Sequence, residues 1–209
     1  MNTNTTGGAA WQTALQVWAA ESTAVQTLAS VVNPEAFEQC VSILAGCTGR
    51  VLTTGCGTSA AAAKKIAHSL CCVERPAAFL SPSDAVHGAL GLVQRNDIVI
   101  AISKGGSTPE ILGMLPAIQT KKAFLIGVTE NGDSALARHS SLWLKVQVPC
   151  EPDPFNMLAT ASTLAVVAVF DAICIALMHV TSYTREQFAV IHPGGAVGQR
   201  LSKPERTQA

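Results

Sequence analysis

A run of hydroxyl side chains and glycines in the middle of the chain follows a short apolar stretch at 98–102. The run consists of Ser103, Lys104, Gly105, Gly106, Ser107, Thr108 and Pro109. A continuous β-branched stretch predicts a strand buried on both faces, and a proline suits the first position of a helix. Glycines let a backbone approach a ligand closely, while hydroxyls and the free N–H groups of a helix start donate hydrogen bonds to anions. The pattern predicts a turn that binds a phosphate monoester; the alternative is an ordinary turn in which Thr108 caps the helix.

A second loop of similar character occurs earlier in the chain, between an apolar run at 51–54 and a helical run at 60–72. Its residues are Gly55, Cys56, Gly57, Thr58 and Ser59. The loop lacks the third glycine and the later acidic residue of a dinucleotide-binding fingerprint, and it lacks the lysine of a nucleoside-triphosphate loop. Two hydroxyl-rich loops at the carboxyl ends of parallel strands favour a small phosphorylated ligand over a nucleotide.

Moving a proton between neighbouring carbons of a sugar phosphate requires an acid–base group, and four side chains are candidates. Glu110 occupies the first turn of the helix expected after Pro109, where complementing the helix dipole is the alternative role. Glu151 lies in a loop before a long apolar segment, where a solvated carboxylate is the simpler interpretation. His192 precedes a Pro-Gly-Gly run, which fixes the backbone around a group that titrates near neutrality; a histidine incidental to the turn is the alternative. His87 lies in a polar loop, where an exposed histidine without a role is the default.

Composition limits the classes of protein to consider. Of the 209 residues, 48% are hydrophobic and 13% charged, and the formal net charge is zero, so a basic surface for nucleic acid is not expected. The seven cysteines have no paired CxxC spacing and the N-terminus has no secretory signal, so we expect free thiols in a reducing cytoplasm. No histidine or cysteine spacing is typical of a metal site. The apolar segment 157–180 carries Asp171 near its centre, which favours a buried core helix over a membrane span.

Strands and helices are expected to alternate along the chain. The expected strands are 51–54, 77–80, 98–102, 124–128 and 142–148. The expected helices are 9–32, 35–45, 60–72, 84–90, 109–119, 133–138, one beginning near Phe155, and 184–189. This alternation predicts an α/β fold, a three-layer sandwich with a five-stranded, mainly parallel sheet flanked by helices. We expect one domain over 1–209, with N-terminal helices at about 9–45 and an α/β core at about 50–201.

Four stretches of the chain resemble a known family. AISKGGSTPEI resembles the phosphate-binding signature of sugar isomerase (SIS) domains. SPSDAVHGALGLVQRNDIVIAIS, SALARHSSLWLKV and FAVIHPGGAVGQRL are similar to the D-arabinose 5-phosphate isomerases within that family. The resemblance covers about residues 40–201 and implies the flavodoxin-like SIS fold, without the two C-terminal CBS modules that many members carry.

The same resemblance implies an activity and an assembly. The activity is the interconversion of D-arabinose 5-phosphate and D-ribulose 5-phosphate through a cis-enediol(ate), with no cofactor and no metal. The product feeds synthesis of the eight-carbon sugar Kdo of lipopolysaccharide or capsule. The implied assembly is a cytoplasmic homotetramer with active sites at its subunit interfaces, and neither a nucleic acid nor a membrane is an expected partner.

Matched position by position, the resemblance also implies the site residues. The catalytic residues are Glu110, Glu151, His192 and His87. The substrate-binding residues are Gly57, Thr58, Ser59, Ser103, Lys104, Gly105, Ser107 and Thr108. Which of the two glutamates carries the proton between C1 and C2 stays open.

This chain departs from the family pattern at three places that line the expected pocket. Thr58 stands where the first loop of the family has a lysine, and residues 104–107 replace an Asn-Ser-Gly-Glu sequence. Residues 153–162 replace a Cys-Pro-Leu-Gly-Leu-Ala-Pro-Thr-Ser-Ser segment. A different sugar phosphate as substrate, and a sugar-phosphate-binding regulatory protein without turnover, are therefore alternatives. A third alternative, a purely structural oligomer, is disfavoured by the retained acid–base residues, and Lys104 is hypothesised to restore the missing cation.

Overall fold

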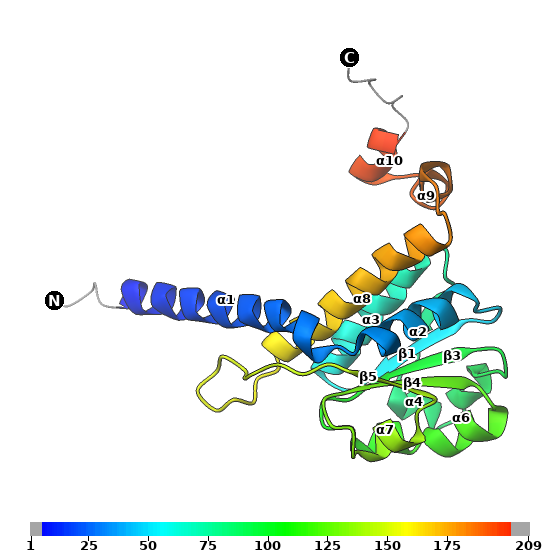
Figure 1. The fold of residues 1–209 in the computed structure, drawn as a ribbon, viewed down its shortest axis with the longest axis horizontal. Helices are drawn as coiled ribbons and strands as arrows, with labels where there is room; N and C mark the ends of the chain where they lie inside the picture. The colour runs from blue at the N-terminus through cyan, green and yellow to red at the C-terminus, as the bar shows by residue number, and fades with distance from the viewer. Residues whose placement is uncertain (1–5, 202–209) are drawn as a thin grey trace.

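The computed structural model describes residues 6–201 and contains a five-stranded parallel sheet with the strand order β2-β1-β3-β4-β5 (Figure 1). The strands are β1 (Val51–Gly55), β2 (Ala77–Phe79), β3 (Ile98–Ile102), β4 (Phe124–Thr129) and β5 (Leu142–Lys145). All four neighbouring pairs run parallel, and β3 pairs with β1 and β4 on its two sides. The predicted α/β class and five-stranded sheet are confirmed.

Side chains of the central strand alternate between two apolar cores, as the period-two geometry of a strand requires. Ile98, Ile100 and Ile102 lie in one core with residues of α1, α2, α3 and α8, whose bounds follow. Val99 and Ala101 lie in the other core with residues of α4, α5, α6 and α7. The helices are α1 (Thr6–Val31), α2 (Pro34–Ala45), α3 (Thr58–Cys71), α4 (Pro82–Ala85), α5 (Pro109–Leu112), α6 (Leu115–Lys121), α7 (Ala135–His139), α8 (Ala161–Val180), α9 (Arg185–Ile191) and α10 (Gly195–Leu201).

Helix α8 accounts for the apolar segment that raised the question of a membrane span. Of the described residues, α8 is the one helix long and apolar enough to cross a membrane by length and composition. It packs against α1, α2 and α3, and Phe170 and Ile173 on its inner face are fully buried. A core helix of a globular domain has the same length and composition, and this packing is that of a core helix.

Three expected helices have other bounds in the structure. The long helix begins at Ala161 rather than near Phe155, because the preceding residues form a separate loop. The expected helix 109–119 is two helices, α5 and α6, separated by Gly113 and Met114. The expected helix 84–90 is the short α4 and a 3₁₀ turn at 89–92, separated by Gly88 in a left-handed conformation (φ 115°).

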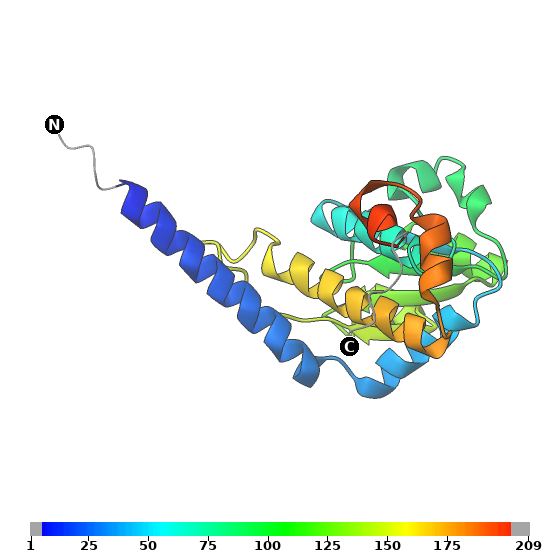
Figure 2. The same ribbon diagram turned by 90° about the horizontal axis from the view of Figure 1, so that it is seen from above.

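Helix α1 extends well beyond the rest of the molecule (Figure 2). Two large apolar side chains on this helix are exposed, since Trp11 is 56% and Trp18 is 53% accessible. Their rings contact each other edge to face, with centroids 5.5 Å apart, and Ala24 is the fully buried residue of the helix. The outer half of α1 therefore presents apolar surface that this chain does not cover.

Candidate active site

The hydroxyl-rich loops after β1 and β3 and the long β5–α8 loop meet at one edge of the sheet. This is the carboxyl edge of the parallel strands, where ligands bind in open α/β sheets. Between the loops lies a pocket of about 120 Å³. Its polar lining consists of Thr58, Ser59, Lys104, Thr129, Ser162 and Thr163. Thr58 and Ser59 of the first loop and Lys104 of the second loop line this one pocket.

A larger and more open hollow of about 560 Å³ lies at the opposite edge of the sheet. Arg95 and Lys122 line it, next to the amino ends of β3 and β4. Since ligands of open parallel sheets bind at the carboxyl edge, we place the candidate site in the smaller pocket.

The turn after β3 is held by hydrogen bonds among its own residues. The Ser103 side chain is buried, and its Oγ accepts from the Gly106 N–H at 3.1 Å and contacts Thr108 Oγ1 at 2.8 Å. Gly106 has a φ of +69°, a conformation that favours glycine. Ser107 is exposed and Thr108 half-buried, and the Thr108 side chain accepts no capping hydrogen bond from α5, although its carbonyl accepts from the Ile111 and Leu112 N–H groups. In this structure Ser103 and Thr108 brace the turn.

The loop after β1 places the start of a long helix beside the pocket. Gly57 has a φ of +58°, and α3 begins at Thr58 with no side chain capping its first N–H groups. Thr58 is exposed and Ser59 half-buried. The first turn of this helix therefore keeps unpaired donors at the pocket wall.

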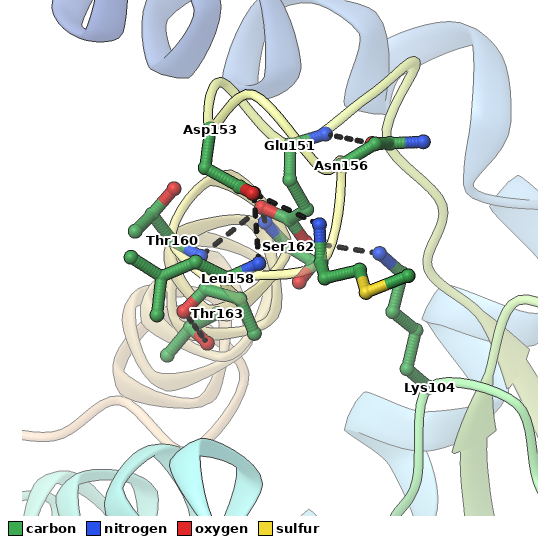
Figure 3. A network of polar contacts seen from close by, with 10 residues as sticks. Lys104, Glu151, Asp153, Asn156, Leu158, Thr160, Ser162 and Thr163 are labelled. Carbon is green, nitrogen blue, oxygen red and sulfur yellow. Dashed lines mark hydrogen bonds and ion pairs between the residues drawn. The ribbon is translucent and has the colours of Figure 1, made fainter.

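The turn after β3 also carries an ion pair that joins the pocket to the β5–α8 loop. Lys104 Nζ donates to Glu151 Oε1 at 2.9 Å (Figure 3). The Lys104 carbonyl accepts from the Glu130 N–H at 3.1 Å and from Thr129 Oγ1 at 2.8 Å, which fixes the backbone of the lysine. The Lys104 side chain is 41% exposed, whereas that of Glu151 is fully buried. The buried carboxylate therefore reaches the pocket through a cation that solvent and ligand can contact.

The second oxygen of Glu151 binds the start of α8. Oε2 accepts from the Thr160 N–H at 3.0 Å and from the Ser162 N–H at 3.3 Å. Burial acts to raise the pKa of Glu151, but hydrogen bonds from Ser162, Lys104 and the two backbone N–H groups outweigh it. The pKa of this carboxyl therefore lies below its ordinary value, and both of its oxygens have partners.

A compact loop positions Glu151, and it was not anticipated from the sequence. Asp153 accepts from the N–H groups of Phe155, Met157 and Leu158 at 2.9, 2.8 and 2.7 Å. Asn156 Oδ1 accepts from the Glu151 N–H at 2.7 Å (Figure 3). Asp followed by Pro and Asn is typical of such turns, and it was the available signal. Residues 153–162, which include Ser162, were expected at the pocket, whereas Thr129 was missed because an ordinary threonine carries no pattern.

Glu110 and His87 lie beside the pocket rather than in it. Burial raises the pKa of the Cys56 thiol and the Glu110 carboxylate raises it further, which places Glu110 next to the first loop. His87 follows Val86, and a Cβ at Gly113 would lie 3.5 Å from Val86 Cγ1, so the His87 segment packs against the end of α5. Both side chains are exposed. Neither Glu110 nor His87 is part of the pocket lining.

His192 is remote from the pocket within one chain. It follows α9, its ring stacks on Phe188 with centroids 3.9 Å apart, and its Nδ1 contacts the Phe188 carbonyl oxygen at 3.0 Å. Glu151 lies at the start of α8, whereas α9 and α10 lie beyond its other end (Figure 1). A helix of 20 residues spans about 30 Å. The structure therefore does not bring His192 to the pocket of its own chain.

The direction of the Glu151 pKa shift predicts how stability depends on pH. A carboxyl whose folded pKa is depressed contributes stability above its unfolded pKa and loses it as pH falls through the folded value. We expect the free energy of unfolding to fall below about pH 5, and to fall less steeply in Glu151→Gln, since an unfolded glutamate titrates near 4.3. Urea titrations of both proteins from pH 7 to pH 3 measure this. Parallel curves for the two proteins would contradict a depressed pKa at Glu151.

Among residues 6–201 no group of three or more His, Cys, Asp or Glu side chains is placed to hold a metal ion. All seven cysteines are free thiols. Burial raises the pKa of Cys40 to about 12 and that of Cys174 to about 11, which keeps both thiols neutral. The polar groups at the pocket are hydroxyls and the Lys104 ammonium, with the Glu151 carboxylate bound to that ammonium.

Several known proteins are similar to this chain in sequence and in fold. Arabinose 5-phosphate isomerase KdsD of Pseudomonas aeruginosa is 39% identical over 181 residues, which are 87% of this chain and 55% of that protein. Arabinose 5-phosphate isomerase KpsF of Escherichia coli O6:H1 is 33% identical over 186 residues, or 89% of this chain and 57% of that protein. The chain thus spans little more than half the length of these curated relatives.

Two solved structures superpose over their full length. A proposed sugar-phosphate isomerase of Listeria monocytogenes is 52% identical with a TM-score of 0.90, and it covers 91% of this chain. The protein c3406 of E. coli CFT073, determined in complex with arabinose 5-phosphate, is 31% identical with a TM-score of 0.85, and it covers 92% of this chain. The SIS domain model itself matches residues 43–176, which hold the sheet, both hydroxyl-rich loops and most of α8. With these loops meeting at the carboxyl edge of a 2-1-3-4-5 parallel sheet, the chain belongs to the SIS domain family.

Proposed function

We propose that this protein is an aldose–ketose isomerase that interconverts D-arabinose 5-phosphate and D-ribulose 5-phosphate through a cis-enediol(ate). The observation that carries the proposal is Lys104, which lines a pocket between the two hydroxyl-rich loops and pairs there with the buried Glu151 carboxylate behind the pocket wall. Curated relatives are named for this activity, and the c3406 structure holds the same sugar phosphate. Ketose formation from D-arabinose 5-phosphate by the purified protein tests the proposal.

In this proposal the phosphate binds at the hydroxyl-rich loops. Ser59 and the uncapped N–H groups at the start of α3 face the pocket, together with the turn after β3. The N-terminus of a helix of 14 residues is a favourable place for a phosphate, because unpaired N–H groups and the dipole act together. Ser107 and Gly105 are exposed on the turn and supply further donors.

Proton transfer between C2 and C1 is assigned to a glutamate. Glu151 is ionised at neutral pH because its pKa is lowered, and a ligand that draws Lys104 away frees one carboxylate oxygen. Glu110, exposed beside the first loop, is the second candidate for this proton. His87 and His192 are assigned to ring opening and to hydroxyl protons, because an imidazole can both accept and donate a proton.

The remote position of His192 supports an active site shared between copies of the chain. Within one chain His192 lies beyond the far end of α8, so it completes the pocket only from a neighbouring subunit. The exposed tryptophans of α1 offer apolar surface for such an assembly. We propose a homotetramer with active sites at subunit interfaces, located in the cytoplasm and supplying synthesis of Kdo.

Mixing two inactive variants tests the shared site. We expect His192→Ala and Glu151→Gln each to lose activity, and their mixture, unfolded together and refolded, to regain about a quarter of it. A site built from two chains is intact only when its Glu151 comes from the His192→Ala chain and its His192 comes from the Glu151→Gln chain. Random assembly of an equal mixture gives this combination in about a quarter of the sites. The measurement is the turnover of D-arabinose 5-phosphate by mixed and separately refolded proteins. A mixture no more active than its components would contradict a site completed in trans.

One observation favours a second function, the binding of a sugar phosphate without turnover. Both oxygens of Glu151 are occupied in this structure, by Lys104 and by the start of α8, as expected for a carboxylate that only positions other groups. A regulatory protein of this kind would bind the sugar phosphate and leave its C2 proton in place. Exchange of the C2 proton of D-arabinose 5-phosphate in heavy water distinguishes the two functions.

A further inference from the structure

Lys104 has a place in the pocket that a purely structural lysine would not need. Among the described residues that line the pocket, it is the one with a cationic side chain. Its ammonium has three N–H donors, and the hydrogen bond to Glu151 Oε1 uses one of them. With 41% of the side chain exposed, the other two donors are open to the pocket and to solvent.

The surroundings of Lys104 fix its backbone and leave its ammonium available. Its carbonyl is held by the Glu130 N–H and by Thr129 Oγ1, at the end of β4. The fully buried Glu151 carboxylate accepts a hydrogen bond from the Lys104 ammonium. The same carboxylate also accepts hydrogen bonds from the Thr160 and Ser162 N–H groups. Because Glu151 keeps these other donors, Lys104 can shift toward an incoming anion without leaving the buried charge without partners.

We propose that Lys104 is the phosphate-binding cation of this site, held over the pocket by Glu151 and supplied from the end of β3. This inference rests on the proposed function, from which it takes the ligand, a sugar phosphate. At neutral pH the phosphate group carries the charge of that ligand. Thr58 lines the same pocket from the start of α3 with a neutral side chain, so the cation comes from the turn after β3 instead. Glu151 is on this account a positioning residue for Lys104 as well as an acid–base candidate.

The first test uses inorganic phosphate, which needs no turnover. Titration calorimetry would compare the wild type with Lys104→Ala, Lys104→Arg and the double variant Lys104→Ala/Glu151→Gln, which leaves no unpaired buried carboxylate. We expect a dissociation constant roughly 10- to 100-fold larger in both alanine variants, the range for a lost charge-assisted hydrogen bond, and partial retention of affinity with arginine. Glu151→Gln alone should weaken phosphate binding less than Lys104→Ala does, because the lysine is still present although it has lost its carboxylate partner. Lys122→Ala, at the opposite edge of the sheet, is the matched control for the loss of one charge.

The second test separates phosphate binding from an effect through Glu151. For D-arabinose 5-phosphate we expect Lys104→Ala to raise KM by about 10- to 100-fold and to lower kcat less. Adding Thr58→Lys to Lys104→Ala should recover most of the lost affinity for both ligands, since position 58 is exposed beside the same pocket. Thermal unfolding of each variant confirms that it is folded.

The results of these tests distinguish a failure of the role proposed for Lys104 from a failure of the isomerase proposal. An unchanged phosphate dissociation constant and KM in Lys104→Ala would overturn it, as would a lower kcat at constant KM, which means that Lys104 acts only through Glu151. No recovery by Thr58→Lys would also count against a common anion site. A wild type that binds phosphate through Lys104 but does not convert the sugar would refute the isomerase proposal and leave this inference standing.

Discussion

Glu151→Gln is expected to lower kcat for D-arabinose 5-phosphate by about 10²–10⁴-fold, the usual contribution of a positioned acid–base group. The amide keeps the size of the side chain but cannot take up a proton, and its NH₂ group cannot accept the hydrogen bond of Lys104. Steady-state kinetics on the ketose product measure the effect. Because phosphate binding is assigned to Lys104 and the loops, KM should change far less than kcat.

Glu38→Gln, an exposed glutamate on α2, is the control for this substitution and should leave kcat unchanged. Glu110→Gln in the same assay shows which of the two glutamates carries the C1–C2 proton. Near-normal turnover in both Glu151→Gln and Glu110→Gln would contradict proton transfer by a glutamate.

Gly106→Ala is expected to destabilise the fold by roughly 2–4 kcal/mol, through backbone strain and overpacking together. Gly106 has a φ of +69°, and an added Cβ would lie 2.9 Å from Thr129 Oγ1 and collide with the Ser134 side chain. Both neighbours are buried and hydrogen-bonded, so neither can move away freely. The free energy of unfolding in urea measures the effect. Because Gly106 lies in the same turn as Lys104, we also expect Gly106→Ala to bind phosphate more weakly.

The adjacent glycine supplies the control. Gly105 has nothing within 4 Å of an added Cβ and is not among the glycines with positive φ, so Gly105→Ala should change the free energy of unfolding by less than about 0.5 kcal/mol. Equal stabilities of the two alanine variants would show that the turn can rearrange around position 106.

The sheet and the turn after β3 could be predicted because local signals agree there. The run 98–102 is apolar and β-branched, and Gly-Gly-Ser-Thr-Pro marks a turn and a helix start. The break between α5 and α6 at Gly113 was missed, since one glycine in an apolar periodic stretch does not by itself end a helix. The bounds of these two helices therefore depend on tertiary packing, which the local sequence pattern does not show.

The site was predicted residue by residue but not as an arrangement. Lys104 and Glu151 were both candidates, yet their ion pair joins residues 47 positions apart and follows from the β5–α8 loop. That loop depends on Asp153 binding three backbone N–H groups, a geometry that begins α8 six residues later than its apolar composition indicated. His192 was a candidate as well, and its separation from the pocket became visible only in three dimensions.

The most direct test of the isomerase proposal is to incubate the purified protein with D-arabinose 5-phosphate in heavy water and to follow the reaction by NMR. The account predicts loss of the C2–H signal by exchange, together with the appearance of D-ribulose 5-phosphate, and neither change with Glu151→Gln. Binding of the sugar phosphate with no exchange and no ketose would contradict the proposed isomerase and identify the protein as a sugar-phosphate-binding one.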